Sequence, residues 1–165
     1  DVGPVISSTA LQRISGVLER ARGAGYSCLS PHTEQSHAGD WVSAGWYVAP
    51  AIVVCDNPQA EIVQEETFGP VLVVQPADDF EQALTLCNGV TQGLVAALFS
   101  GAPDRQAQFL AQAQAGMLKI NQATAGAASG APFGGWKASG VGPPEHGVGD
   151  LEFFTRHQTI YQNLS

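Results

Sequence analysis

Residues 71–87 read VLVVQPADDFEQALTLC, and this stretch decides the fold class. Residues 71–75 form an apolar run that has the length of a buried strand. Asp78 or Asp79 then offers a helix N-cap. Apolar residues follow at helical spacing on one face, namely Phe80, Ala83, Leu84 and Cys87. The stretch therefore predicts a strand followed directly by an amphipathic helix.

The same alternation continues toward the carboxyl end. Residues 94–99 form a second apolar run, and Pro103 opens a second helix. The apolar face of that helix is predicted to consist of Ala107, Leu110, Ala111 and Ala113. Residues 117–120 supply a third strand. Two right-handed βαβ units follow from this order of strand, helix, strand, helix and strand. We therefore expect an α/β fold, with a parallel open sheet and flanking helices.

The flanking segments complete the predicted organisation. Residues 8–22 predict a helix whose N-cap is Ser7, Ser8 or Thr9. Pro50 makes residues 46–55 an edge strand or an irregular extended segment. The remaining expectations are a polar surface loop at 30–45, a glycine-rich loop at 121–144, a short helix at 145–155 and a final strand at 159–162. A loop that follows the carboxyl end of a strand is where α/β sheets place ligands.

Composition excludes several functional classes. The 165 residues are 44% hydrophobic and 13% charged, with a net charge of −8. An acidic chain gives no electrostatic reason to bind nucleic acid or an anionic membrane. No apolar run is long enough for a membrane helix. The four histidines lack metal-ligand spacing, so no metal site is predicted. The length fits one domain, residues 1–165.

Five motifs in one order carry a family resemblance. They are GPVIS at 3–7, EETFGPV at 65–71, GMLKIN at 116–121, PFGGWKASG at 132–140, and EFFT at 152–155 followed by QTIY. Their sequence and spacing resemble those of the aldehyde dehydrogenases, over nearly the whole chain. The resemblance implies the catalytic-domain fold of that family and an NAD- or NADP-dependent oxidation of an aldehyde to a carboxylic acid. In that reaction a thiohemiacetal and a thioester form on a cysteine.

The resemblance also assigns roles to individual residues. It implies that Glu66 accepts hydrogen bonds from the nicotinamide ribose and that Phe68 packs beside the nicotinamide. It places Phe133 in the wall of the aldehyde tunnel, where Gly134 and Gly135 would adopt positive φ. Simpler interpretations remain open. Glu66 could be a solvated residue in an acidic turn, and either phenylalanine could be ordinary core.

A second loop resembles a subfamily. Residues 121–126 read NQATAG and resemble the N-x-x-T-A-G loop of α-ketoglutaric semialdehyde dehydrogenases. This resemblance implies that Asn121, Thr124, Ala125 and Gly126 contact the substrate. Asn121 could instead only cap its loop. Lys137 and Ser139 are interpreted as hydrogen-bond donors that hold their loop.

The catalytic residues of the family have no match in this chain. The family's nucleophilic cysteine and general-base glutamate precede the GPVIS motif, as does its dinucleotide-binding domain. We therefore expect a carboxyl-terminal part of the catalytic domain, inactive alone. Free cysteines are commonly buried and inert, and we assign no catalytic role to Cys28, Cys55 or Cys87.

Two other functional classes remain open. One is a non-enzymatic binding module with the same fold, and the other is an acylating, CoA-dependent relative. Three cysteines without a paired spacing predict reduced thiols in a cytoplasmic protein. The family resemblance further implies a protein that acts on a small-molecule aldehyde. It also implies a homodimer or homotetramer, with residues 159–162 pairing across subunits.

Overall fold

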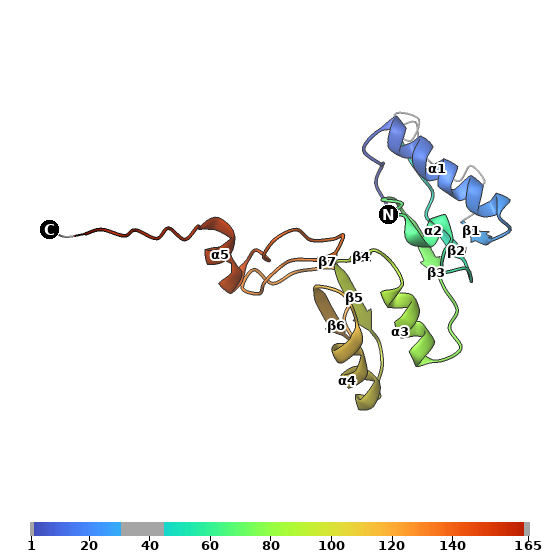
Figure 1. The fold of residues 1–165 in the computed structure, drawn as a ribbon. Helices are drawn as coiled ribbons and strands as arrows, with labels where there is room; N and C mark the ends of the chain where they lie inside the picture. Colours follow the sequence, from blue (N-terminus) through green and yellow to red (C-terminus); the bar gives the residue numbers. More distant parts are fainter. Residues whose placement is uncertain (1, 31–44, 164–165) are drawn as a thin grey trace. The chain divides into compact units, whose positions relative to one another are not determined.

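A computed structural model describes residues 2–30 and 45–163. The predicted polar loop lies almost entirely outside these residues. The chain forms two compact units, Asp1–Asp79 and Phe80–Ser165 (Figure 1). Whether residues 1–165 behave as a single domain stays a prediction. No helix in the described ranges has the length and apolar character needed to cross a membrane.

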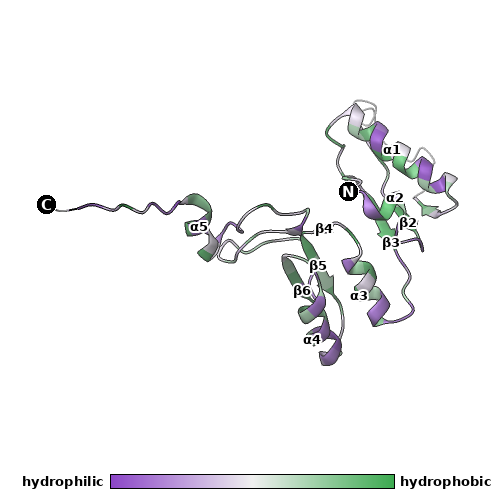
Figure 2. Cartoon of the chain, viewed as in Figure 1, coloured by the Kyte–Doolittle hydropathy of each residue, from purple (hydrophilic) through white to green (hydrophobic). Residues whose placement is uncertain are grey.

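The first unit is a three-stranded sheet with a long helix packed on it. Its elements are α1 (Ser8–Gly23), β1 (Ser27–Leu29), β2 (Ala51–Val54), α2 (Glu61–Gln64) and β3 (Val71–Val74). The strand order is β1-β2-β3, with β1 antiparallel to β2 and β2 parallel to β3. Helix α1 is amphipathic and carries both polar and apolar residues along its length (Figure 2). It buries Ile14, Val17, Leu18 and Ala21 against Ala51 and Val53 of the sheet.

One feature of this unit differs from expectation, while the cap of α1 is one of its three predicted candidates. Strand β2 is the central strand, so the prediction of an edge or irregular segment was wrong. The reason is that Pro50 stands just before β2, where its missing N–H removes no bond from the ladder. The cap of α1 is Ser7, whose side chain accepts a hydrogen bond from Ala10 N at 3.1 Å. Helix α1 itself and strand β3 confirm the predictions.

The second unit contains one complete βαβ unit. Its elements are α3 (Phe80–Asn88), β4 (Gln92–Gly93), β5 (Val95–Leu98), α4 (Pro103–Gln112), β6 (Met117–Ile120), β7 (Trp136–Lys137), the 3₁₀ helix η2 (Gly147–Gly149) and α5 (Asp150–Phe154). Strands β5 and β6 are parallel, as predicted, with α4 between them in sequence. Strands β3 and β5 belong to different sheets, so the first predicted βαβ unit is divided between the two units.

The predicted helix faces need correction. In α4 the buried residue is Phe109, whereas Ala107, Leu110 and Ala111 are exposed. In α3 only Leu84 is buried, and Cys87 is exposed. Phe109 and Leu84 share one core with Ala96 of β5. The error follows from the alanines, because small residues at helical spacing do not show which stripe faces the sheet.

The carboxyl-terminal third also differs in part. The predicted loop at 121–144 contains β7, which pairs antiparallel with β4. The predicted helix at 145–155 is present as η2 and α5. Residues 159–162 form no strand. A strand requires a hydrogen-bonded neighbour, and the described part of the chain provides none for these residues.

Candidate functional site

A turn between α2 and β3 presents the predicted cofactor-binding side chains. Phe68 in this turn has φ 47°, a left-handed backbone conformation that aromatic residues seldom adopt. The side chains of Glu66 and Phe68 are exposed, Phe68 to 78%. Within the described residues, no hydrogen bond or ion pair engages the Glu66 carboxylate. The turn thus offers a free carboxylate and an aromatic ring two positions apart, which fits a group with ribose hydroxyls and a flat ring.

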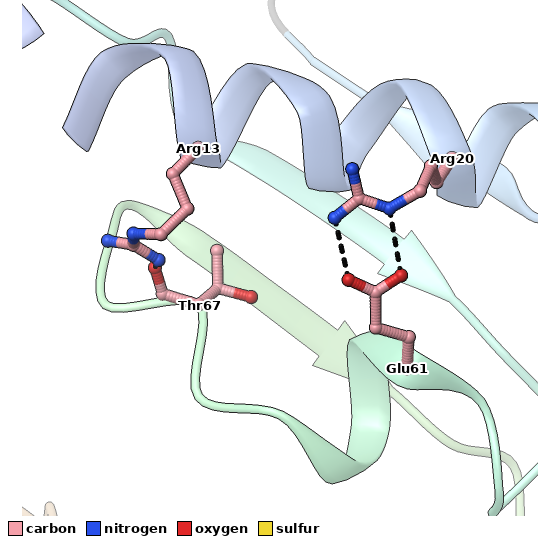
Figure 3. Close-up of polar contacts among 4 residues, drawn as sticks. All are labelled: Arg13, Arg20, Glu61 and Thr67. Carbon is pink, nitrogen blue, oxygen red and sulfur yellow. Dashed lines mark hydrogen bonds and ion pairs between the residues drawn. The ribbon is translucent and has the colours of Figure 1, made fainter. Parts of the chain in front are cut away.

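Helix α1 holds the segment that forms this turn (Figure 3). The Arg20 guanidinium pairs with the Glu61 carboxylate, with Nη2–Oε1 at 2.6 Å and Nε–Oε2 at 2.9 Å. The hydrogen bond from Arg20 lowers the pKa of the Glu61 carboxyl below its ordinary value. Arg13 donates hydrogen bonds to the main-chain carbonyls of Thr67 and Phe68. Two arginines of one helix therefore reach both ends of the segment.

Gly69 explains why the turn lies so close to α1. A Cβ built at Gly69 would lie 2.6 Å from Cδ1 of Ile14. Ile14 is fully buried, so its side chain has little room to move aside. Glycine at this position therefore allows the turn to pack directly on the helix.

Phe133 lines a pocket in the second unit. Its main chain pairs with Glu145 through N–O distances of 2.6 and 3.1 Å. Its ring meets the His146 ring edge-on, with the centroids 5.9 Å apart. The surrounding pocket has a volume of about 420 Å³, and its lining includes Leu94, Gly116 and Phe153. An apolar ring in a pocket wall is compatible with the predicted aldehyde-facing role.

The reason for the paired glycines beside Phe133 differs from the prediction. Gly134 and Gly135 do not have positive φ, so that expectation was wrong. Gly135 instead lies so close to the main-chain oxygen of Ser139 that a Cβ would collide with it. Close approach of two backbone segments, rather than a left-handed turn, requires glycine here.

The loop after β6 carries the other predicted substrate residues. The Asn121 side chain accepts a hydrogen bond from Ser100 N at 2.8 Å and donates one to Ser100 O at 3.1 Å. This is the loop-capping arrangement, while a substrate contact of Asn121 stays a prediction. Thr124 is exposed. The Lys119 ammonium donates to the carbonyls of Ala125 and Gly126, each at 2.7 Å.

Lys137 and Ser139 hold their loop in place. Lys137 Nζ donates to the carbonyls of Asn88 and Val90 at 2.7 and 2.9 Å. The Ser139 hydroxyl oxygen accepts a hydrogen bond from Gly93 N at 2.9 Å. The structural interpretation is confirmed, although Ser139 acts as an acceptor rather than a donor.

Two of the three cysteines have surroundings that bear on their reactivity. Cys55 is fully buried at the base of the first core. Cys87 is exposed as a residue, but partial burial of its thiol group raises the pKa of the thiol, which opposes formation of the reactive thiolate at neutral pH. A nucleophilic cysteine requires the opposite shift.

The structure groups the predicted residues in two places. Glu66 and Phe68 lie in the first unit, and the five predicted substrate residues lie in the second. The lining of the Phe133 pocket does not include residues 121–126. Sequence reasoning missed Arg13 and Lys119. The sequence carried a signal for Lys119, because a charged residue inside an apolar strand is unusual. It carried none for Arg13, which binds a carbonyl 54 residues away.

Comparisons with known proteins agree on one family. Residues 1–160 match the aldehyde dehydrogenase family. The chain is 34% identical over 160 residues to the α-ketoglutaric semialdehyde dehydrogenase of Bacillus subtilis. The alignment covers 97% of this chain and 32% of that protein. It is 30% identical to the α-ketoglutarate semialdehyde dehydrogenase of Haloferax volcanii, covering 99% and 34%. The chain thus spans about a third of the length of these relatives.

Solved structures show the same fold. A putative methylmalonate-semialdehyde dehydrogenase of Sinorhizobium meliloti, crystallised with NAD, aligns with a TM-score of 0.86 and 28% identity, over 94% of this chain and 32% of that one. A betaine aldehyde dehydrogenase of Staphylococcus aureus, a double mutant in complex with NAD⁺, aligns with a TM-score of 0.83 and 28% identity, over 93% and 30%.

Proposed function

This chain belongs to the aldehyde dehydrogenase family, and from that premise we propose that it forms part of the site of an NAD- or NADP-dependent enzyme that oxidises an aldehyde to a carboxylic acid. The nucleophilic cysteine and the general-base glutamate would come from a part of the protein outside these 165 residues. The observation that carries the proposal is the exposed turn between α2 and β3, which presents Glu66 and Phe68 two positions apart and is contacted by Arg13 of α1.

Each of these two side chains has a defined task toward the cofactor. The Glu66 carboxylate has two acceptor oxygens, which suit the hydroxyls of the nicotinamide ribose. The Phe68 ring would lie beside the nicotinamide and limit its movement. When bound, the nicotinamide accepts a hydride from the substrate. The chain's own contribution is to orient that ring.

On the substrate side, Phe133 would form an apolar wall facing the aldehyde. A cysteine supplied by the remainder of the protein would attack the carbonyl carbon to give a thiohemiacetal, and loss of hydride would leave a thioester. Water activated by a carboxylate then releases the acid. Phe133 and its pocket would keep bulk water from the reacting carbon.

We further propose that the substrate carries a carboxylate, as α-ketoglutaric semialdehyde does. An ammonium has three N–H donors, and Lys119 uses two of them on the carbonyls of Ala125 and Gly126. The third donor is available to an anionic group at the loop of residues 121–126. The names of the Bacillus and Haloferax relatives support the same substrate class.

The test uses the complete protein, meaning the natural product of the gene that encodes this chain. Reduction of NAD and NADP is measured with α-ketoglutaric semialdehyde, with succinic semialdehyde and with the neutral aldehyde pentanal. We expect turnover with all three aldehydes. The KM should be lower for the two semialdehydes, which carry a carboxylate, than for pentanal. Lys119→Met should raise the KM of the carboxylated substrates and leave that of pentanal unchanged. An equal effect on all three substrates would contradict the role of Lys119.

The same assay distinguishes the enzyme from the two other functional classes, a binding module and an acylating relative. A binding module would show no turnover with any aldehyde. An acylating relative would release the acyl group only when CoA is added, as its thioester rather than as the free acid.

We propose that the complete enzyme acts as a homodimer or homotetramer.

A further inference from the structure

The backbone of Phe68 is strained, and the strain lies at the centre of the proposed cofactor site. Its φ of 47° is a left-handed value that places Cβ against the following carbonyl oxygen. Such a conformation persists only where the surrounding structure over-determines it. Phe68 is 78% exposed, so burial of its ring in the described part of the chain does not hold it. Something else must fix the backbone.

Arg13 supplies that constraint. Its guanidinium donates to the carbonyl of Thr67 through Nη1 and to the carbonyl of Phe68, at 3.3 Å, through Nη2. A planar guanidinium presents parallel donors in a fixed fork, which matches two adjacent carbonyls. The two carbonyls flank the nitrogen and Cα of Phe68, so holding both restricts its φ.

The neighbouring contacts assign Arg13 and Arg20 different tasks. The two arginines are seven residues apart, which places them on the same face of α1, two turns apart. Arg20 binds the carboxylate of Glu61 and fixes α2, whereas Arg13 binds only main-chain oxygens of the turn. Because Arg13 uses the backbone, the Glu66 carboxylate stays available to a ligand.

We propose that Arg13 is a positioning residue for the cofactor: its guanidinium holds Phe68 in the left-handed conformation and so aims the Glu66 carboxylate and the Phe68 ring at the nicotinamide ribose. The proposal rests on the function proposed above for Glu66 and Phe68. It adds a residue of α1 that contacts the main chain of the turn. Loss of Arg13 should therefore weaken cofactor handling while the fold persists.

The first measurement concerns the turn alone and needs no catalysis. In the 165-residue chain, NMR reports the HN–Hα coupling of Phe68 and the exchange rates of the amides of Phe68 and Gly69. Arg13→Met should move the coupling away from its left-handed value and speed both exchange rates. Arg13→Lys should restore part of the effect, because an ammonium can bind one of the carbonyls. Arg22→Met on the same helix is the matched control and should change nothing. An unchanged Phe68 coupling in Arg13→Met would overturn the proposal.

The second measurement uses the complete protein and separates cofactor from substrate. Arg13→Met should raise the KM for NAD by about tenfold, the scale of a charge-assisted hydrogen bond, with little change in the KM for the aldehyde. Arg20→Met should not reproduce this pattern. In a Phe68→Gly background, where positive φ carries no strain, the effect of Arg13→Met should fall to about twofold or less. Equal effects in both backgrounds would contradict the proposal.

These results also distinguish two failures. If the complete protein oxidises no aldehyde, the proposed function and the cofactor role of Arg13 fail together. If it is active, and Glu66→Gln impairs cofactor handling while Arg13→Met does not, only the inference about Arg13 is wrong.

Discussion

Arg20 on α1 and Glu61 on α2 form a two-point ion pair that joins segments 41 residues apart. Both side chains are about half exposed, so solvent screens the attraction. Its value is geometric, because it fixes the start of the segment that ends in the Glu66–Phe68 turn. The pair therefore stabilises the first unit at α2, ahead of the turn that Arg13 contacts.

The ion pair predicts a pH-dependent loss of stability. Arg20 lowers the pKa of Glu61 by hydrogen bonding, so the stabilisation is complete above the ordinary glutamate pKa and is lost as the pH falls through the lowered value. Arg20→Met should lower the midpoint of thermal unfolding slightly at pH 7. The difference from the wild type should shrink in acid, once Glu61 is protonated, and in high salt. A difference that is the same at neutral and acidic pH would exclude this role.

Glu66 is expected to matter for the cofactor and not for the fold. Glu66→Gln keeps the size of the side chain and removes the charge. A hydrogen bond to a charged group contributes about 1.5–3 kcal/mol, so cofactor handling by the complete protein should weaken about tenfold or more. Thermal unfolding should be unchanged, because the side chain is exposed. Unaltered kinetics with both NAD and NADP would remove the ribose-binding role.

Gly135 should tolerate no side chain. In Gly135→Ala the new Cβ would meet the main-chain oxygen of Ser139, so the backbone around β7 must shift. Overpacking of this kind costs about 1–3 kcal/mol, measurable by denaturant unfolding. Gly101→Ala is the control, because a Cβ there has open space. If the two variants unfold alike, the close approach at Gly135 is not a constraint.

The parts of the fold that the sequence predicted are those with local signals. Strand β3, helix α1 and the β5-α4-β6 unit were recognisable from apolar runs, spacing and a proline or cap. The central position of β2 was not, because strand order depends on pairing between residues distant in sequence. The same holds for Arg13, whose partners lie in a turn more than 50 residues away. The motif around Glu66 located the candidate site, while its supporting contacts required the structure.

The segment at 159–162 predicts an assembly contact. Ile160 and Tyr161 are 77% and 95% exposed and form no strand in the described chain. A partner strand in another subunit would give their backbone groups hydrogen bonds and cover their side chains. Deleting residues 158–165 from the complete protein should lower its mass in solution and its heat stability. Retention of the wild-type oligomeric state would show that this segment is not an assembly element.

The most direct measurement compares aldehyde-dependent NAD and NADP reduction by two proteins, the 165-residue chain alone and the complete protein that contains it. The chain supplies Glu66, Phe68 and Phe133 and is proposed to lack the nucleophile, so it should show no turnover with α-ketoglutaric semialdehyde. The complete protein should reduce the cofactor and release the acid, and it should do so less well with Glu66→Gln. Turnover by the chain alone that survives repurification, or no turnover by the complete protein with any aldehyde, would contradict the proposed division of the site.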